Sequence, residues 1–181
     1  MKLFGWLKGK GTNTPLEGWR RAWDEAINGT DAGDGELRRQ LDIVTHGEPD
    51  VELELEMLDA LDQLRAVQRA VAGGSLPVVE THHRVIGPDA CHFSAPASLP
   101  SDHGQAAGRV LLTGSKAVFV GGGRTSATAW HLVNEIARIE RDVLLARVDG
   151  AAAAHFRFNT FADAVVCAFL ARHLKGSTRR L

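Results

Sequence analysis

The sequence predicts an α+β protein in which an N-terminal helical segment precedes a small antiparallel β-barrel capped by a C-terminal helix. Apolar residues recur at helical spacing before residue 74, which favours helices. From Pro77 the chain changes to short β-branched and aromatic runs separated by turn residues, which favours strands. An amphipathic run after Thr160 is typical of a helix that covers the open end of a barrel. We therefore divide the chain into a helical segment, residues 1–74, and a barrel domain, residues 75–181.

The helical segment contains three predicted helices. The first begins at Thr14, in a Thr-Pro-Leu-Glu sequence that supplies a cap, a proline at the first helical position and a capping box. Trp19 and Trp23 lie on its apolar stripe, and we interpret them as packing residues rather than as a ligand-stacking pair. Asn28-Gly29 ends this helix. The other two helices are expected at residues 36–46 and 49–71.

The barrel domain is predicted from a series of short strands and turns. The strands are expected at residues 78–86, 90–95, 108–113, 116–121, 127–133, 135–140, 143–148 and 153–158. Turn residues at 87–89, 114–115, 121–123 and 149–150 separate several of them. Residues 94–105 are interpreted as a loop because they contain Pro96, Pro100 and Gly104. The final helix is expected at residues 160–175, capped by Asn159 or Thr160.

The alternation of apolar residues along these strands predicts the core. Val118 and Phe119 are neighbours, so one of the two should face outward. The predicted core residues are Leu111, Val118, Phe119, Ile136, Ile139, Phe156, Phe158, Val165 and Phe169.

Composition excludes several classes of protein. The chain has 181 residues, of which 44% are hydrophobic and 24% charged, and its net charge of −1 gives no sign of nucleic-acid binding. Cys91 and Cys167 are too few for a disulfide framework, and we expect both to be reduced and buried. No apolar run approaches the ~20 residues that span a bilayer. We expect a cytoplasmic protein, and the abundance of Ala, Gly and Arg suggests a bacterial one.

Several segments resemble a known superfamily. Residues 108–121, Gly-Arg-Val-Leu-Leu-Thr-Gly-Ser-Lys-Ala-Val-Phe-Val-Gly, are similar to the hairpin of GRAM-like and other bacterial PH-like domains. Residues 132–140 resemble the segment that follows it, and residues 155–158 with the 160–175 helix resemble the last strand and helix. The resemblance covers about residues 77–175. It implies a PH-like barrel that binds lipid headgroups, peptides or proteins and is not an enzyme.

Searches for chemistry in the sequence find no coherent catalytic or metal motif. Neighbouring residues on a strand point to opposite faces, so His82-His83 and Cys91-His92 each offer at most one metal ligand per face. No CxxC or HExxH pattern is present, and no nucleophile-elbow sequence frames Ser126. We therefore expect no catalytic residues, no metal and no cofactor.

Two groups of residues are candidates for binding. If an anion binds the barrel, Arg109, Lys116 and Arg124 are the best candidates, because hairpin turns gather donors at a barrel rim. At the amino terminus, Leu3, Phe4, Trp6, Leu7 and Lys8 combine apolar bulk with positive charge, which suits a membrane contact. Docking of this segment on the barrel or on another subunit stays open as an alternative.

The function expected from these observations is that of a non-catalytic PH-like binding or adaptor module with a protein or peptide partner. The missing basic cluster in the first hairpin argues against phosphoinositide binding. Two alternatives stay open, a peripheral module on anionic membrane lipid and an unrecognised enzyme. The sequence does not indicate the ligand, the pathway or the oligomeric state.

Overall fold

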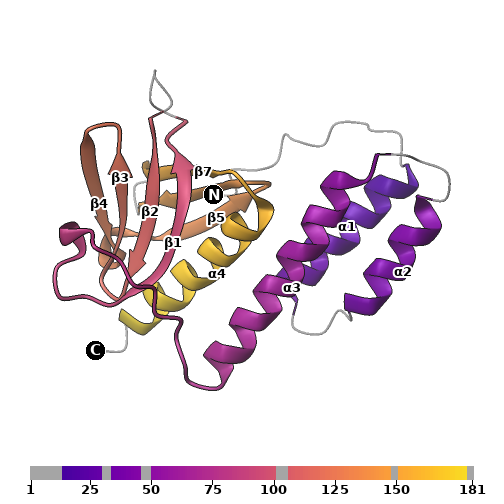
Figure 1. The fold of residues 1–181 in the computed structure, drawn as a ribbon, viewed down its shortest axis with the longest axis horizontal. Helices are drawn as coiled ribbons and strands as arrows, with labels where there is room; N and C mark the ends of the chain where they lie inside the picture. The colour runs from indigo at the N-terminus through magenta and orange to yellow at the C-terminus, as the bar shows by residue number, and fades with distance from the viewer. Residues whose placement is uncertain (1–13, 30–33, 46–49, 101–105, 148–150, 179–181) are drawn as a thin grey trace. The chain divides into compact units, whose positions relative to one another are not determined.

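The computed structural model describes residues 14–29, 34–45, 50–100, 106–147 and 151–178. Within these residues it is an α+β structure with four α-helices and one seven-stranded antiparallel sheet (Figure 1). By compactness the chain divides into two units, Met1–Glu54 and Leu55–Leu181, and the division falls inside the third helix.

The first unit contains α1 (Pro15–Asn28) and α2 (Asp34–Val44). The predicted capping box is present: the amide of Glu17 donates to the Thr14 hydroxyl, and the Thr14 amide donates to the Glu17 carboxylate, each at 3.2 Å. Trp19 and Trp23 are buried, and the indole of Trp19 donates to the backbone oxygen of Leu37 in α2 at 2.8 Å. The two tryptophans are therefore packing residues, as predicted.

The third helix, α3 (Glu52–Ala72), begins in the first unit. Its first turn carries Glu54, which is 1% exposed and accepts from Arg20 Nε of α1 at 2.7 Å. Leu53, in the same turn, is 36% exposed. The helix ends at Gly73-Gly74, where Gly74 has φ 81° and the amide of Ser75 donates to the carbonyl of Ala70.

The second unit contains the sheet, whose strands follow the order β4-β3-β2-β1-β7-β6-β5. β1 and β7 pair only at Ala97 with Phe158 and at Ser98 with Arg157, so a four-stranded and a three-stranded meander meet in a short seam. β4 and β5 are the edges, and the sheet is not closed by hydrogen bonds within the described residues. The strands are β1 (Cys91–Ser98), β2 (Ala107–Thr113), β3 (Lys116–Gly121), β4 (Arg124–Ala129), β5 (Glu135–Ile139), β6 (Asp142–Ala146) and β7 (Ala152–Phe158).

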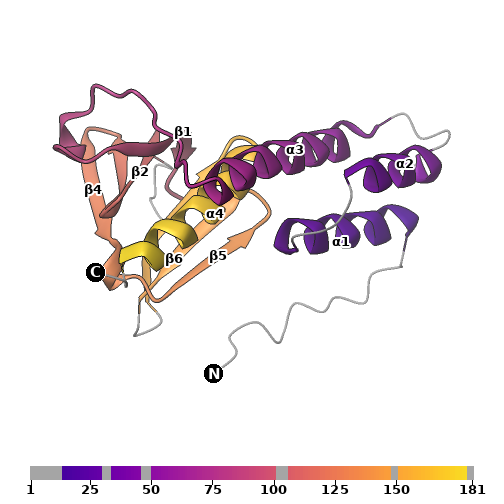
Figure 2. The ribbon, with the colours of Figure 1, turned by 90° about the horizontal axis from the view of Figure 1, so that it is seen from below.

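The main core lies between the sheet and α4 (Phe161–Thr178), which runs along one face of the sheet in both views (Figures 1 and 2). Thr160 caps this helix by accepting from the amide of Asp163 at 3.1 Å. In the core, Phe93 meets Phe158 edge-on, with ring centroids 5.9 Å apart. Seven predicted core residues are buried: Leu111, Val118, Phe119, Ile136, Phe156, Phe158 and Val165. Phe169 is only partly buried, and Ile139 is 44% exposed because it ends the edge strand β5.

A second apolar cluster covers the opposite face of the sheet, and it corrects the expected alternation. Val118 and Phe119 are both 0% exposed, although they point to opposite faces of β3. Phe119 belongs to the main core, whereas Val118 packs with Leu111, Cys91 and Ile86. Residues 77–90, which we call the covering segment, supply Ile86 and the partly buried Val79 and Val85 to this outer cluster.

Three predicted boundaries are wrong for identifiable reasons. Residues 78–86 are not a strand: they form an irregular run that ends in the 3₁₀ turn η1 (Arg84–Ile86). β1 extends to Ser98 despite Pro96, since β1 has a ladder partner on its β7 side only at its last two residues, and a proline fits there as on an edge strand. The strand expected at 127–133 ends at Ala129, where a second 3₁₀ turn, η2 (Trp130–Leu132), begins.

The part of α3 that belongs to the second unit is anchored on the sheet and on α4. Glu56 forms an ion pair with Arg141 and accepts from the amide of Phe161, the first residue of α4, at 2.8 Å. The guanidinium of Arg141 in turn lies over the Phe161 ring, 4.9 Å from its centroid. Val67 and Val71 extend the contact by packing on the main core. The part of α3 from Leu55 onward is therefore an integral part of this unit.

Candidate functional site

A hollow of about 370 Å³ lies where the covering segment crosses β1 and β2. One side is formed by the covering segment and the other by polar side chains of the two strands. It is lined by Val79, Glu80, Thr81, His82, His83, Ser94 and Arg109.

Two backbone contacts fix the position of the covering segment over β1. The amide of Val79 donates to the carbonyl of Cys91 at 2.8 Å, and the ring of His92 contacts the carbonyl of Pro77 through Nδ1, also at 2.8 Å. A β-bulge at His92 shifts the register between Cys91 and Phe93. Because of this extra residue, the side chains of Cys91 and Phe93 point to opposite faces of the sheet. Cys91 packs in the outer cluster and Phe93 in the main core, so β1 contacts both.

The far end of the covering segment is fixed at the β2–β3 turn. The carboxylate of Asp89 accepts from the hydroxyls of Ser115 at 2.5 Å and Thr113 at 3.2 Å. The Thr113 hydroxyl also accepts from the backbone amides of Ser115 and Lys116, which fixes the turn between β2 and β3. The indole of Trp130 donates to the Thr113 carbonyl at 2.9 Å. Both ends of the covering segment, which forms one side of the hollow, are therefore fixed to the sheet.

Arg109 is the principal charged group of the hollow. Its Nε donates to the hydroxyl of Ser94 at 3.2 Å, and one terminal nitrogen lies 3.4 Å from the Ser94 carbonyl. Among the residues that the structure describes, no carboxylate lies within ion-pair distance of this guanidinium. Glu80 lines the same hollow. An arginine that is oriented by a neutral serine retains donors for a carboxylate or phosphate group of a ligand.

The three predicted anion-binding residues do not lie together. Arg109 is on the outer face of β2, because its neighbour Val110 points into the main core. Arg124 pairs with Gly121 at the β3–β4 turn and, by strand alternation, lies on the other face. Lys116 is at the opposite end of β3, where its amino group donates to the carbonyl of Val85 at 3.3 Å. Of the three, only Arg109 lines the hollow.

The predicted membrane-contact residues Leu3, Phe4, Trp6, Leu7 and Lys8 lie outside the described residues. No described helix is both long and apolar enough to cross a bilayer.

Sequence reasoning missed that Ser94 hydrogen-bonds Arg109 and that Glu80 lines the same hollow. Ser94 falls in both the predicted strand 90–95 and the predicted loop 94–105, and Glu80 falls in the predicted strand 78–86; neither prediction places these residues beside Arg109. The available signal was the continuous burial of residues 110–112 and 117–119, in which apolar side chains follow one another without polar alternation. Such a run indicates that both faces of a strand are covered.

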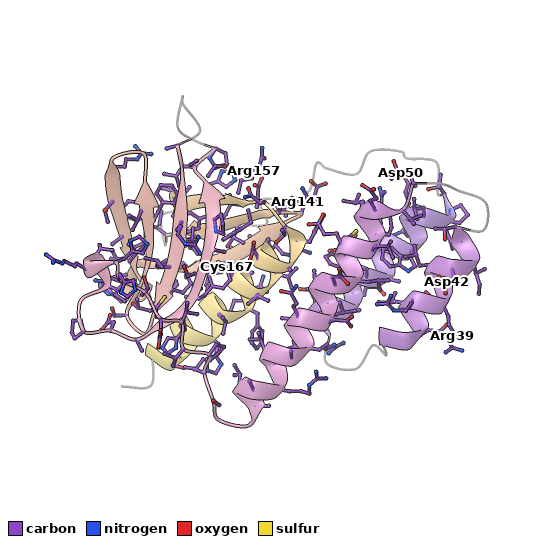
Figure 3. All side chains as sticks on the ribbon, in the orientation of Figure 1. Arg39, Asp42, Asp50, Arg141, Arg157 and Cys167 are labelled. Atoms are coloured by element: carbon purple, nitrogen blue, oxygen red, sulfur yellow. The ribbon has the colours of Figure 1, made fainter. Side chains whose placement is uncertain are left out.

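Other titratable groups form structural contacts. Asp142 of β6 accepts two hydrogen bonds from Arg157 of β7, each at 2.8 Å, and this pairing lowers the pKa of the Asp142 carboxyl. Burial raises the pKa of both the Cys91 and the Cys167 thiols, which disfavours the reactive thiolate. Figure 3 labels Arg141, Arg157 and Cys167. No group of three or more potential metal ligands occurs among the residues described.

Comparison of the chain with models of known protein families and with curated proteins finds no match. The interpretation of the hollow therefore depends on its own geometry and charge.

Proposed function

We propose that the sheet and its C-terminal helix form a PH-like, non-catalytic module that binds an acidic segment of a partner protein in the hollow at Arg109. The order of the strands supports the PH-like assignment. A four-stranded and a three-stranded antiparallel meander meet at β1 and β7, and the final helix packs on the core side of the sheet.

The observation that carries the proposal is that Arg109 is held by a neutral serine and has no ion-pair partner among the described residues. Ser94 holds the guanidinium in place at the edge of a hollow, and no described carboxylate neutralises it. A ligand carboxylate would gain a charge-assisted hydrogen bond there, a contact worth roughly 1.5–3 kcal/mol.

Charge in the hollow favours a peptide over a polyphosphate headgroup. Glu80 places a carboxylate in the same space as Arg109. A headgroup with several phosphates would be repelled by Glu80, whereas a peptide carries both carboxylates and N–H donors. The side chains of Thr81 and Ser94 add hydroxyl groups that can pair with a peptide backbone. The hollow is therefore better matched to an extended polypeptide.

The test uses the full chain and an array of synthetic peptides that contain Asp and Glu, followed by calorimetry on the best binder. Arg109→Gln should weaken its binding roughly tenfold or more, since about 1.4 kcal/mol corresponds to a factor of ten. Arg124→Gln is the matched control, because it removes an exposed arginine from the same sheet outside the hollow. Equal loss in both variants, or no loss in R109Q, would overturn the proposal.

A second arm uses vesicles of phosphatidylcholine with and without phosphatidylserine. We expect no binding that depends on Arg109. Sedimentation with anionic vesicles that is lost in R109Q, without any peptide binding, would assign the hollow to lipid instead.

A further inference from the structure

The two edges of the sheet differ in how their backbone groups are protected. At β5, side chains of α4 contact backbone carbonyls: Arg172 donates through Nε and a terminal nitrogen to Ile136 at 3.3 and 3.2 Å, and Lys175 donates to Asn134, the residue before the strand, at 2.6 Å. Burial and the neighbouring Arg138 lower the pKa of Arg172. These contacts occupy part of the β5 edge.

The register of β4 identifies the backbone groups that its outer edge exposes. β3 and β4 are joined by the two-residue turn Gly122-Gly123, with φ angles of 58° and 74°, so the closing pair Gly121–Arg124 is hydrogen-bonded. Alternation then directs the amides and carbonyls of residues 124, 126 and 128 toward β3. The groups of Thr125, Ala127 and Ala129 face away from the sheet. Within the described part of the chain, they have no backbone hydrogen-bond partner outside the strand.

After Arg124 at the start of β4, the side chains of the strand do not block this edge. Residues 124–127 are exposed, and residues 128 and 129 are partly buried. Edge strands commonly carry lysine, proline or a bulge that prevents pairing with another chain. Thr125-Ser126-Ala127-Thr128-Ala129 contains no charge and no proline, and its pairing with β3 shows no bulge. The strand is therefore an unprotected template for a further strand.

We propose that the outer edge of β4 pairs with β4 of a second copy of this chain, antiparallel and centred on Ala127. This inference does not depend on the proposed peptide binding. With Ala127 on the two-fold axis, Thr125 of each copy lies opposite Ala129 of the other. The three outward-facing residues then form hydrogen-bonded pairs, each exchanging two bonds. The register therefore satisfies the exposed amides and carbonyls of Thr125, Ala127 and Ala129 in both copies.

Charge and size favour a second copy as the occupant. On one face, Ala127 meets Ala127 of the second copy, and on the other, Ser126 meets Thr128. These side chains are small and neutral, so directly opposed positions bring no like charges together. Arg124, the charged residue of the strand, would lie opposite position 130, beyond the end of β4, and the arginines of the two copies do not face each other. The edge is self-complementary.

The test measures the mass of the full chain by analytical ultracentrifugation over a range of concentrations. The wild type should form dimers as the concentration rises. Ala127→Lys and Ala127→Glu should each be monomeric, because each places two like charges on the two-fold axis. An equimolar mixture of the two variants should restore the dimer. Val78→Lys is the matched control, since it adds the same charge at a side chain that is 71% exposed and lies away from β4.

Circular dichroism and thermal melting show whether the variants keep their fold, as expected for an exposed position. A wild type that stays monomeric would overturn the proposal, and so would dimers that persist in A127K or are lost in V78K. Failure of the mixture to dimerise would refute the register. Hydrogen exchange adds an independent readout: the amides of Thr125, Ala127 and Ala129 should exchange more slowly as the dimer forms, and unchanged exchange would place the interface elsewhere.

Discussion

Gly108 and Gly121 face each other across β2 and β3 at a distance that leaves no room for a side chain. A Cβ atom on Gly108 would lie 2.3 Å from the Val120 oxygen, 2.7 Å from Gly121 Cα and 2.7 Å from Cζ of Phe119. All three atoms belong to β3: two are backbone atoms, and the third is in the ring of Phe119, a residue that is 0% exposed in the main core. None can rotate away, so Gly108→Ala must displace β3.

The expected cost follows from this displacement. Extra atoms in a tightly packed region cost about 1–3 kcal/mol. Replacing glycine by alanine also lowers the entropy of the unfolded chain, which adds about 0.4–1 kcal/mol to the free energy of unfolding. We expect a net loss of about 1–2 kcal/mol in the free energy of unfolding, and a fall in melting temperature of roughly 2–8 °C for a chain of this size.

Urea unfolding followed by circular dichroism measures this loss, and Gly114→Ala is the matched control. Gly114 lies at the other end of the same hairpin, where a Cβ would have no neighbour within 4 Å and φ is not positive. Its stability should stay unchanged or rise by up to about 1 kcal/mol. A G108A protein as stable as the wild type, or a G114A protein that loses as much as G108A, would refute the reasoning.

Three further results are expected. Glu56→Ala should lower the free energy of unfolding by about 1–2 kcal/mol in urea titrations, because α4 loses an acceptor at its first amide and Arg141 loses its partner. Glu56→Gln keeps an acceptor and should therefore lose less stability. Equal losses in the two variants would contradict the capping role of Glu56. The Cys91 and Cys167 thiols should react with Ellman's reagent only as the protein unfolds, since both are buried and their pKa values are raised; rapid labelling in native buffer would refute this. Because Arg157 lowers the pKa of Asp142, their pairing stabilises the fold above the ordinary Asp pKa of about 3.9 and is lost as the pH falls through the lowered value. The difference in unfolding free energy between wild type and Arg157→Gln should therefore be constant above about pH 5 and shrink below about pH 4, and a difference that persists in acid would count against the pairing.

Local chemistry explains why much of the fold could be predicted. The Thr14 capping box and the glycine turns of the hairpins depend on residues within a few positions of one another. The hairpin of β2 and β3 was predicted within one residue of its observed bounds for the same reason. These elements specify their own conformation, and tertiary packing does not override them.

The covering segment shows where such reasoning fails. Val78, Val79, Val85 and Ile86 have the composition of a strand, but Val79, Val85 and Ile86 contribute to a packed cluster on the sheet without forming a ladder themselves. Composition does not distinguish a strand from an irregular segment with a few apolar contacts. The hollow could not be predicted for a related reason, because Arg109 meets Ser94 and the covering segment only after the chain has folded.

We expect the covering segment to limit aggregation as well, because of what it covers. It shields Leu111 and Val118, two apolar residues on adjacent strands that are each 0% exposed. β4, the unprotected edge, lies directly beside β3 and pairs Ala127 with Val118. Local detachment of the segment would therefore expose a hydrophobic strip next to open backbone donors and acceptors, the combination from which cross-β assemblies grow. The Asp89 contacts to Ser115 and Thr113 hold this segment on the sheet. We therefore expect them to limit off-pathway assembly as well as to fix a turn.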